Sequence, residues 1–245
     1  MKLYWLEQVQ ADVPTGNDWL SPWEATRFDS FRFPKRRADW RLGRWTAKQA
    51  LAAALNLGSD DLALTAIEIR PASSGAPEVF INSERAPVAI SLSHREGRAM
   101  CAIARRELRV GCDLESVEAH GDVFVADYFT AEEQQAIAAV SAPDRERTVS
   151  LLWSAKESAL KALHEGLRLD TRTVIASFEP AALNREGWGI LEVRYADQVF
   201  KGWWQQTDHL VRTIVADAPS TAPILLPVTS LVERGFVSEC APLLR

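Results

Sequence analysis

Two carboxylates stand two residues apart in the segment RVGCDLESVE, which begins at Arg109. Side chains alternate across a strand, so Asp113 and Glu115 are expected to share one face with Gly111, while apolar residues occupy the other face. At a rise of about 3.3 Å per residue, their Cα atoms would lie roughly 6.5–7 Å apart, and both carboxylates could reach one hard cation such as Mg²⁺. Gly111 would leave room for a bulky ligand beside the backbone. The structural alternative is an edge strand whose outer face is simply solvated.

A third acid, Glu157, lies in the segment WSAKESALKALHEGL, where we predict a helix that begins at Ser154. Two structural explanations are available, because Ser154 and Glu157 have the spacing of a capping box and Glu157 could pair with Lys161 four residues on. The functional interpretation makes Glu157 a third oxygen ligand, with Lys156 and Lys161 near a helix terminus that favours anions. Carboxylates, a hard cation and lysines together are suited to polyphosphate chemistry.

Two other segments carry groups that could act on a proton or a phosphate. In FTAEEQQAI, Thr130 and Glu133 have capping-box spacing, which we favour as structural, although Glu133 could also serve as a proton acceptor. In SLSHREG, a strand leads into a turn at His94, and Ser93 and His94 could donate hydrogen bonds to a phosphate.

The segment KRRADWRLGRWTAK concentrates positive charge in a chain whose net charge is −5. This pattern indicates either a solvated helix face or a local anion site. The overall negative charge argues against a general nucleic-acid binder, because neutralising phosphates requires a basic surface. The basic residues of the segment are Lys35, Arg36, Arg37, Arg41, Arg44 and Lys48.

The composition is that of an ordinary globular protein, with 47% hydrophobic and 25% charged residues. The three cysteines, Cys101, Cys112 and Cys240, indicate neither a disulfide framework nor a zinc site. The N-terminal segment MKLYWLEQVQADV becomes polar too soon for a signal peptide, and no apolar run has the length of a membrane span. We therefore expect a cytoplasmic protein without a membrane partner.

Helices and strands of similar size are predicted in both halves of the chain, which indicates an α+β protein with two lobes. We place the N-terminal lobe at residues 1–106, the C-terminal lobe at 107–220 and a Pro-rich tail that wraps the surface at 221–245. Helices are expected within 22–56 and from Thr130 and Ser154, and strands near 64–70, 86–94, 98–105, 108–115, 173–179, 190–195, 199–205 and 209–216.

The ordered set SLSH, VGCDLE, FTAEE and WSAKESALKAL resembles the 4′-phosphopantetheinyl transferases of the single-chain, surfactin-synthetase-activating type. The signature of that family is a Gly-x-Asp-x-Glu strand followed by Trp-Ser-x-Lys-Glu-x-x-x-Lys, and both parts occur here in that order. By motif, the resemblance covers about residues 35–170. It implies two similar α+β lobes that form an internal pseudo-dimer, which would act as a monomer, with coenzyme A and Mg²⁺ in the cleft between them.

The resemblance also assigns roles to individual residues. Asp113, Glu115 and Glu157 would match the carboxylates that bind Mg²⁺, and Lys161 would hold the diphosphate of coenzyme A. Ala76 stands where the family often has a lysine. Arg70 or another basic residue could compensate for it, or the affinity for the nucleotide end could be lower. The residues assigned to coenzyme A are Lys35, Arg37, Arg44, Lys48, Ser93, His94, Lys156 and Lys161.

The implied reaction moves the 4′-phosphopantetheine group from coenzyme A to a serine of an acyl or peptidyl carrier protein and releases adenosine 3′,5′-bisphosphate. Lys161 would neutralise the diphosphate, and Glu157 or Glu133 would accept the proton of the serine. Two alternatives stay open at this point. One is a different Mg²⁺-dependent phosphohydrolase or nucleotidyl enzyme, and the other is a coenzyme-A-binding protein without catalytic activity.

Overall fold

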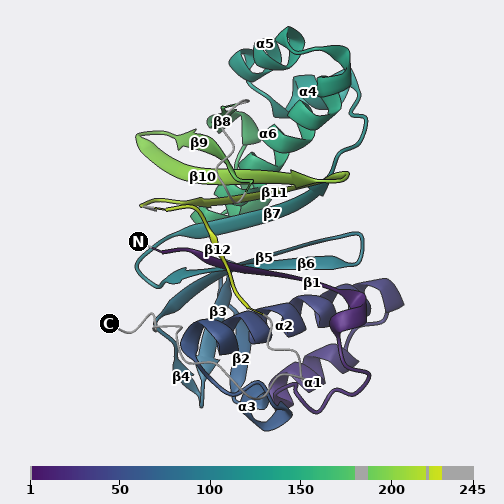
Figure 1. The fold of residues 1–245 in the computed structure, drawn as a ribbon, viewed down its shortest axis with the longest axis vertical. Helices are drawn as coiled ribbons and strands as arrows, with labels where there is room; N and C mark the ends of the chain where they lie inside the picture. The colour runs from purple at the N-terminus through teal and green to yellow at the C-terminus, as the bar shows by residue number, and fades with distance from the viewer. Residues whose placement is uncertain (1, 180–186, 219–220, 228–245) are drawn as a thin grey trace. The chain divides into compact units, whose positions relative to one another are not determined.

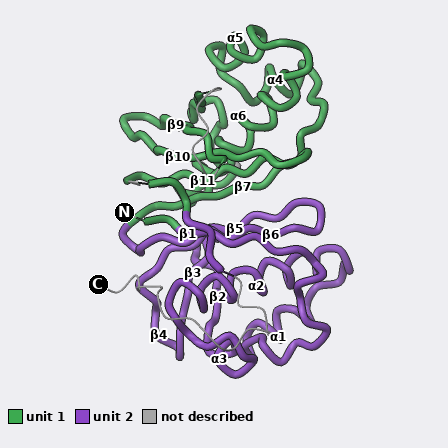
Figure 2. The backbone as a smooth tube through the Cα atoms, in the orientation of Figure 1, with its two compact units in different colours: residues 1–3, 108–223 green, residues 4–107, 224–245 purple. Residues whose placement is uncertain are grey.

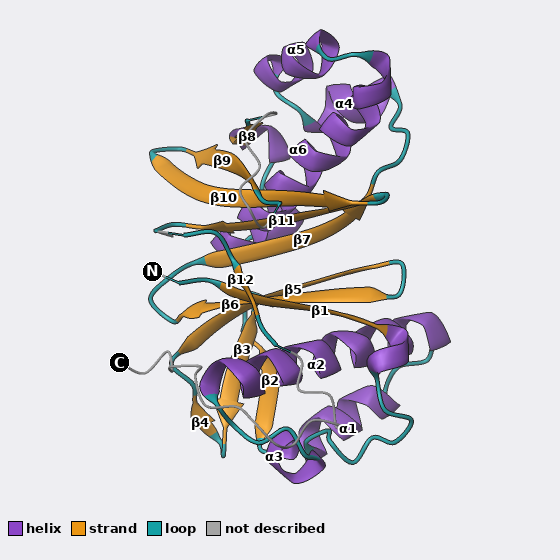
Figure 3. Ribbon diagram, viewed as in Figure 1, coloured by secondary structure: helices purple, strands orange, loops and turns teal. Residues whose placement is uncertain are grey.

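The computed structural model describes residues 2–179, 187–218 and 221–227, and the chain divides into two compact units (Figure 2). Unit 1 contains residues 1–3 and 108–223, and unit 2 contains residues 4–107 and 224–245. Both units mix helices with antiparallel strands, so the protein is of the mixed α+β class (Figure 3). Of the predicted tail, residues 228–245 lie outside the described residues.

Unit 2 contains a long helix, α2, that packs against a sheet with the order β12-β1-β6-β5 (Figure 1). Within this sheet β1 and β12 are parallel and the other pairs are antiparallel, and β2, β3 and β4 form a second sheet. The elements are β1 (Tyr4–Val9), η1 (Gln10–Asp12), α1 (Pro22–Asp29), α2 (Pro34–Leu55), α3 (Asp61–Thr65), β2 (Ile67–Pro71), β3 (Pro77–Ile81), β4 (Glu84–Arg85), β5 (Val88–Arg95), β6 (Arg98–Arg105) and β12 (Ile224–Leu225).

The predicted helical segment 22–56 is in fact two helices, α1 and α2. Pro34 begins α2, at a position where the missing N–H of proline removes no helical hydrogen bond. Asn56 ends the helix in the left-handed region, with φ 54°, which is a common way for helices to stop. The strand predicted near 64–70 begins later than expected, because α3 occupies the start of that segment.

Unit 1 contains a five-stranded antiparallel sheet with the order β7-β11-β10-β9-β8, and α6 packs mainly on β7 and β11. The four strands predicted between 173 and 216 are confirmed as β8 to β11. The elements are β7 (Val110–Ser116), α4 (Asp122–Tyr128), α5 (Ala131–Ala139), α6 (Ala142–Leu163), η2 (Gly166–Arg168), η3 (Thr171–Thr173), β8 (Val174–Phe178), β9 (Gly189–Tyr195), β10 (Gln198–Thr207) and β11 (Leu210–Ala216).

The helix predicted to begin at Ser154 begins much earlier, with Ser141 as the N-cap and Pro143 in the first turn. Ser154 is therefore a buried residue inside α6, and the predicted capping box with Glu157 is wrong. The expected helix terminus near Lys156 and Lys161 is wrong for the same reason, so helix-end amides do not contribute an anion site there. The capping box of Thr130 and Glu133 at the start of α5, by contrast, is confirmed.

Among the described residues, none of the helices combines the length and apolar character needed to cross a membrane.

Candidate functional site

The face of β7 that carries Gly111 and Asp113 is turned toward α6. A Cβ added to Gly111 would lie 1.8 Å from the backbone oxygen of Ser158 and 2.8 Å from the backbone nitrogen of Ala162. The helix backbone therefore fills the space that the sequence suggested for a ligand. Asp113 is only 4% exposed, so the alternative of a solvated outer face is also wrong. Glycine is required here because the helix and the strand approach each other closely.

Hydroxyl groups hold α6 against this face of the sheet. Thr213 of β11 lies opposite Asp113 in the strand register. Its Oγ1 lies 2.8 Å from Ser154 Oγ and 2.7 Å from Ser158 Oγ, and it donates to the backbone oxygen of Ser154 at 2.9 Å. All three hydroxyls are buried, so these hydrogen bonds satisfy groups that would otherwise be costly to enclose. These hydrogen bonds hold α6 close to β11 and therefore also close to the neighbouring strand β7.

Lys161 reaches from α6 to β7. Its Nζ donates to Asp113 Oδ1 at 2.7 Å and to the backbone oxygen of Cys112 at 3.1 Å. Burial disfavours the charged ammonium, but the negative charges of Asp113 and Glu157 outweigh this effect and raise the pKa of Lys161. The lysine is therefore held as a cation beside Asp113 while part of its side chain stays exposed.

Glu157 lies one turn before Lys161 on the same helix. Burial raises the pKa of Glu157, repulsion from Asp113 raises it further, and attraction to Lys161 opposes the rise. Its Oε1 atom is buried and, among the described residues, has no hydrogen-bond partner. A buried oxygen without a partner is costly, and a proton or a cation would relieve that cost.

Asp113 and Glu157 have the chemistry of magnesium ligands. Mg²⁺ prefers oxygen ligands and usually binds one or two carboxylates together with water and substrate phosphates. Asp113 and Glu157 repel each other, and Glu157 carries the buried oxygen without a partner. Within the described part of the chain, however, no group of three His, Cys, Asp or Glu residues is placed to hold a metal ion. The structure therefore does not place Glu115 with Asp113 and Glu157 as a third metal ligand.

Lys156 is on the same helix as Lys161 but is enclosed completely. Its ammonium donates to Glu133 Oε2 at 2.8 Å and to the backbone oxygens of Thr171 and Val174 at 2.9 and 2.5 Å. Burial lowers the pKa of Lys156, although Glu133 opposes the shift. Glu133 in turn accepts from the backbone nitrogens of Thr130 and Ala176, each at 2.8 Å. An ammonium has three N–H donors, so Lys156 has none left for a ligand.

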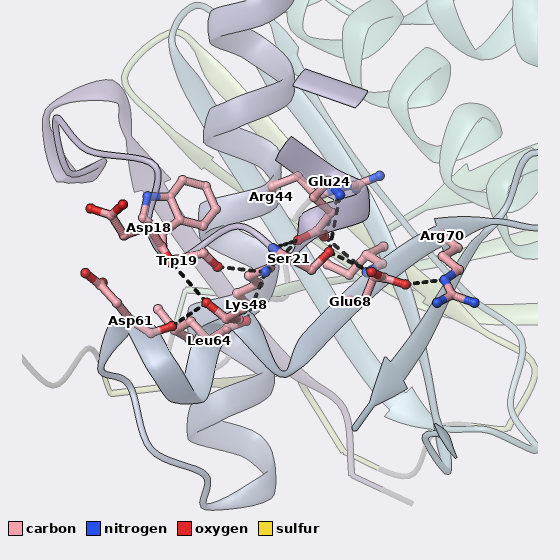
Figure 4. Close-up of polar contacts among 12 residues, drawn as sticks. Asp18, Trp19, Ser21, Glu24, Arg44, Lys48, Asp61, Leu64, Glu68 and Arg70 are labelled. Carbon is pink, nitrogen blue, oxygen red and sulfur yellow. Dashed lines mark hydrogen bonds and ion pairs between the residues drawn. The ribbon is translucent and has the colours of Figure 1, made fainter. Parts of the chain in front are cut away.

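Lys48 occupies the same kind of network in unit 2 (Figure 4). Its Nζ pairs with Glu24 at 2.6 Å and donates to the backbone oxygens of Trp19 and Leu64, each at 2.9 Å. Glu24, like Glu133, caps a short helix that precedes a long one, and it accepts from a strand nitrogen, that of Ile69, at 3.1 Å. The structure thus gives Lys48 and Lys156 a different role from the predicted contact with coenzyme A.

A pocket of about 570 Å³ lies in unit 2 between α2 and the end of β5. Four of the residues predicted to contact coenzyme A line it, namely Lys35, Arg44, Ser93 and His94. Arg37 is not among the lining residues, and its guanidinium lies over the ring of Phe28 and pairs with Asp29. The full lining consists of Phe33, Lys35, Arg36, Asp39, Trp40, Gly43, Arg44, Leu92, Ser93 and His94.

Sequence reasoning named Arg36 as part of a possible anion site but missed Asp39 and Trp40 as members of this pocket. Their spacing carried the signal, because positions 35, 39 and 43 and positions 36, 40 and 44 each recur every four residues and so share one helix face. Arg44 lies deepest among the cations, with its guanidinium 4.8 Å from the centre of the Trp40 ring and its Nε 3.7 Å from Glu24. Burial lowers the pKa of Arg44, and the negative charge of Glu24 opposes this shift.

Comparison with curated proteins gives no match to this chain. Comparison with protein families gives one for residues 109–216, a range that contains β7, α6 and β11 and therefore Asp113, Glu157 and Lys161. The part of the chain that positions this cluster matches the 4′-phosphopantetheinyl transferase superfamily.

Proposed function

We propose that the protein transfers the 4′-phosphopantetheine group of coenzyme A to a serine of an acyl or peptidyl carrier protein. The observation that carries this proposal is the cluster of Asp113, Glu157 and Lys161, in a segment that matches the transferase superfamily. The cluster combines two mutually repelling carboxylates with one cation, as a site for a metal ion and a diphosphate requires.

Lys161 is suited to bind the diphosphate of coenzyme A. Its charge is secured by Asp113, and its side chain stays partly exposed, so it can also contact a ligand. A preorganised cation of this kind stabilises charge that develops on phosphate oxygens in the transition state. Asp113 and Glu157 would hold Mg²⁺, which when bound would neutralise further charge on the diphosphate.

Glu157 is the better candidate for the group that accepts the proton of the attacking serine. Its buried Oε1 has no hydrogen-bond partner among the described residues, so this oxygen could accept the proton while the other oxygen holds the metal. Glu133 is less suited, because its two oxygens already accept from Lys156, Thr130 and Ala176. We therefore assign Glu133 and Lys156 to the support of α6 and α5, and we leave proton transfer to Glu157.

The pocket of unit 2 is suited to the nucleotide end of coenzyme A, which carries a 3′-phosphate. Lys35, Arg36 and Arg44 supply positive charge on α2, and Ser93 and His94 supply donors on β5. Arg70 is already paired with Glu68 and lies over the ring of Phe80, so Arg36 is a better substitute for the family lysine that Ala76 replaces.

The proposal is tested by incubating the protein with coenzyme A, Mg²⁺ and an apo-carrier protein and then weighing the carrier by mass spectrometry. We expect the carrier to gain the mass of one phosphopantetheine group, with release of an equal amount of adenosine 3′,5′-bisphosphate. If several acyl and peptidyl carriers gain no mass, the proposal is wrong. Cleavage of coenzyme A without a carrier would instead favour a phosphohydrolase.

A further inference from the structure

We propose that Asp39 is a specificity-determining residue of the pocket in unit 2. It makes the pocket select a phosphate ligand that also presents hydroxyl or amino donors, as a nucleoside phosphate does, over a bare polyphosphate. The proposal rests on the proposed function, because that function assigns the nucleotide end of coenzyme A to this pocket.

Asp39 is placed where a ligand in the pocket would meet it. It lies on the same face of α2 as Lys35 and Gly43, and all three line the pocket. Its side chain is 25% exposed, and its Oδ2 lies 3.9 Å from Nε2 of His94, another residue of the lining. That distance is too long for a hydrogen bond, so the carboxylate is near His94 without being bonded to it.

The charge of Asp39 works against the binding of a simple anion. The other charged groups of the lining, Lys35, Arg36 and Arg44, are cations that would attract any phosphate. A carboxylate among them repels each phosphate oxygen that comes near, and this repulsion is strong in a site that is partly shielded from water. An ionised carboxylate can only accept hydrogen bonds, so a ligand gains from Asp39 only by offering a donor.

The uncharged residues of the lining fit a ligand that carries a ring as well as a phosphate. Phe33 and Trp40 supply aromatic surface, and Trp40 is held in place by Phe31, whose ring centre is 5.6 Å away, and by the guanidinium of Arg44. Gly43 adds open space, because a Cβ at this position would have no neighbour within 4 Å. A nucleoside would place its ring against the aromatic wall and its hydroxyl or amino donors toward Asp39.

The experiment measures the affinity of the full chain for two probes, adenosine 3′,5′-bisphosphate and inorganic pyrophosphate, by calorimetry at one fixed ionic strength. Asp39→Asn and Asp39→Ser remove the charge, and circular dichroism shows whether each variant is folded. The matched control is Asp18→Asn, which removes the same charge from an exposed residue of unit 2 that does not line the pocket.

We expect both Asp39 variants to bind pyrophosphate more tightly than the wild type and the nucleotide no more tightly. The ratio of the two affinities should therefore fall by about tenfold, the order expected from the Coulomb energy of one charge near a phosphate in a partly shielded site. Asp18→Asn should leave the ratio unchanged. If the wild type binds the nucleotide and the ratio does not fall in either Asp39 variant, the inference is wrong while the proposed function stands. If the wild type does not bind the nucleotide, the inference is wrong together with the assignment of this pocket, and the carrier assay decides separately whether the transferase proposal survives.

Discussion

Replacing Gly111 by alanine tests the close approach of α6 to β7. The added Cβ would lie 1.8 Å from the backbone oxygen of Ser158 and 2.8 Å from the backbone nitrogen of Ala162. Both neighbours are backbone atoms of a helix that is held to the sheet by buried hydrogen bonds, so neither can turn aside as a side chain could. The helix must instead move away from the strand.

The size of the effect follows from what this movement disturbs. Overpacking a well-packed core by one methyl group costs about 1–3 kcal/mol. The same displacement would also lengthen the contact of Lys161 with Asp113, now 2.7 Å, and weaken a partly buried ion pair. We therefore expect the free energy of unfolding to fall by about 3 kcal/mol, at the upper end of that range.

Urea denaturation followed by circular dichroism measures this change. Gly43→Ala is the control, because a Cβ at that helical position meets nothing within 4 Å. Alanine in place of a glycine inside a helix stabilises by roughly 0.5–1 kcal/mol, so the two variants should shift the midpoint in opposite directions. If Gly111→Ala unfolds at the same urea concentration as the wild type, our account of the α6–β7 contact is refuted.

Three further predictions concern the charged residues of unit 1. The pKa of Glu157 in the folded protein lies above its usual value of 4.5, so the folded state keeps a proton that the unfolded state has already lost. The free energy of unfolding therefore falls as the pH rises from about 4.5 through the pKa of the folded state. In urea denaturation, Glu157→Gln should therefore be more stable than the wild type at pH 7.5 and should lose this advantage near pH 4.5. If the variant and the wild type are equally stable at both pH values, the burial of the Glu157 charge is contradicted. Saturating MgCl₂ should raise the melting temperature of the wild type but not that of Glu157→Gln or Asp113→Asn, because binding to the folded state alone stabilises it; an equal shift in all three proteins would place the ion elsewhere. Lys156→Met should cost about 3–5 kcal/mol of unfolding free energy by leaving Glu133 buried and unpaired, and the added change Glu133→Gln should recover part of it; a neutral single variant would argue against the buried pair.

The sequence was informative where spacing alone brings residues together. The alternation of β7 placed Gly111 and Asp113 on one face, and the helical period placed Glu157 and Lys161 on one side of α6, as the structure has them. The start of α6 could not be found from Ser154 and Glu157, because Ser-x-x-Glu is a capping box only at a helix start. The better signal was Pro143, since proline is favoured in a first turn.

The roles of the lysines depend on contacts between distant segments, which spacing does not reveal. Lys156 and Lys161 are five residues apart on one helix, yet the first points into backbone oxygens of a later loop and strand, and the second points to β7. Lys48 is likewise enclosed by the segments around Trp19 and Leu64. Such enclosure depends on tertiary packing, so a list of basic residues could not separate ligand contacts from structural ones.

The most direct measurement compares these two lysines of α6 in the transfer reaction. Lys161→Met and the double variant Lys156→Met with Glu133→Gln are assayed with coenzyme A, Mg²⁺ and an apo-carrier protein, and rates are expressed per folded protein. We predict that Lys161→Met loses transfer by about 10²–10³-fold, as removal of a group that stabilises transition-state charge typically does, while the double variant keeps transfer within a few fold. Full activity of Lys161→Met, or loss of transfer in the folded double variant alone, would contradict the assignment of the site to Asp113, Glu157 and Lys161.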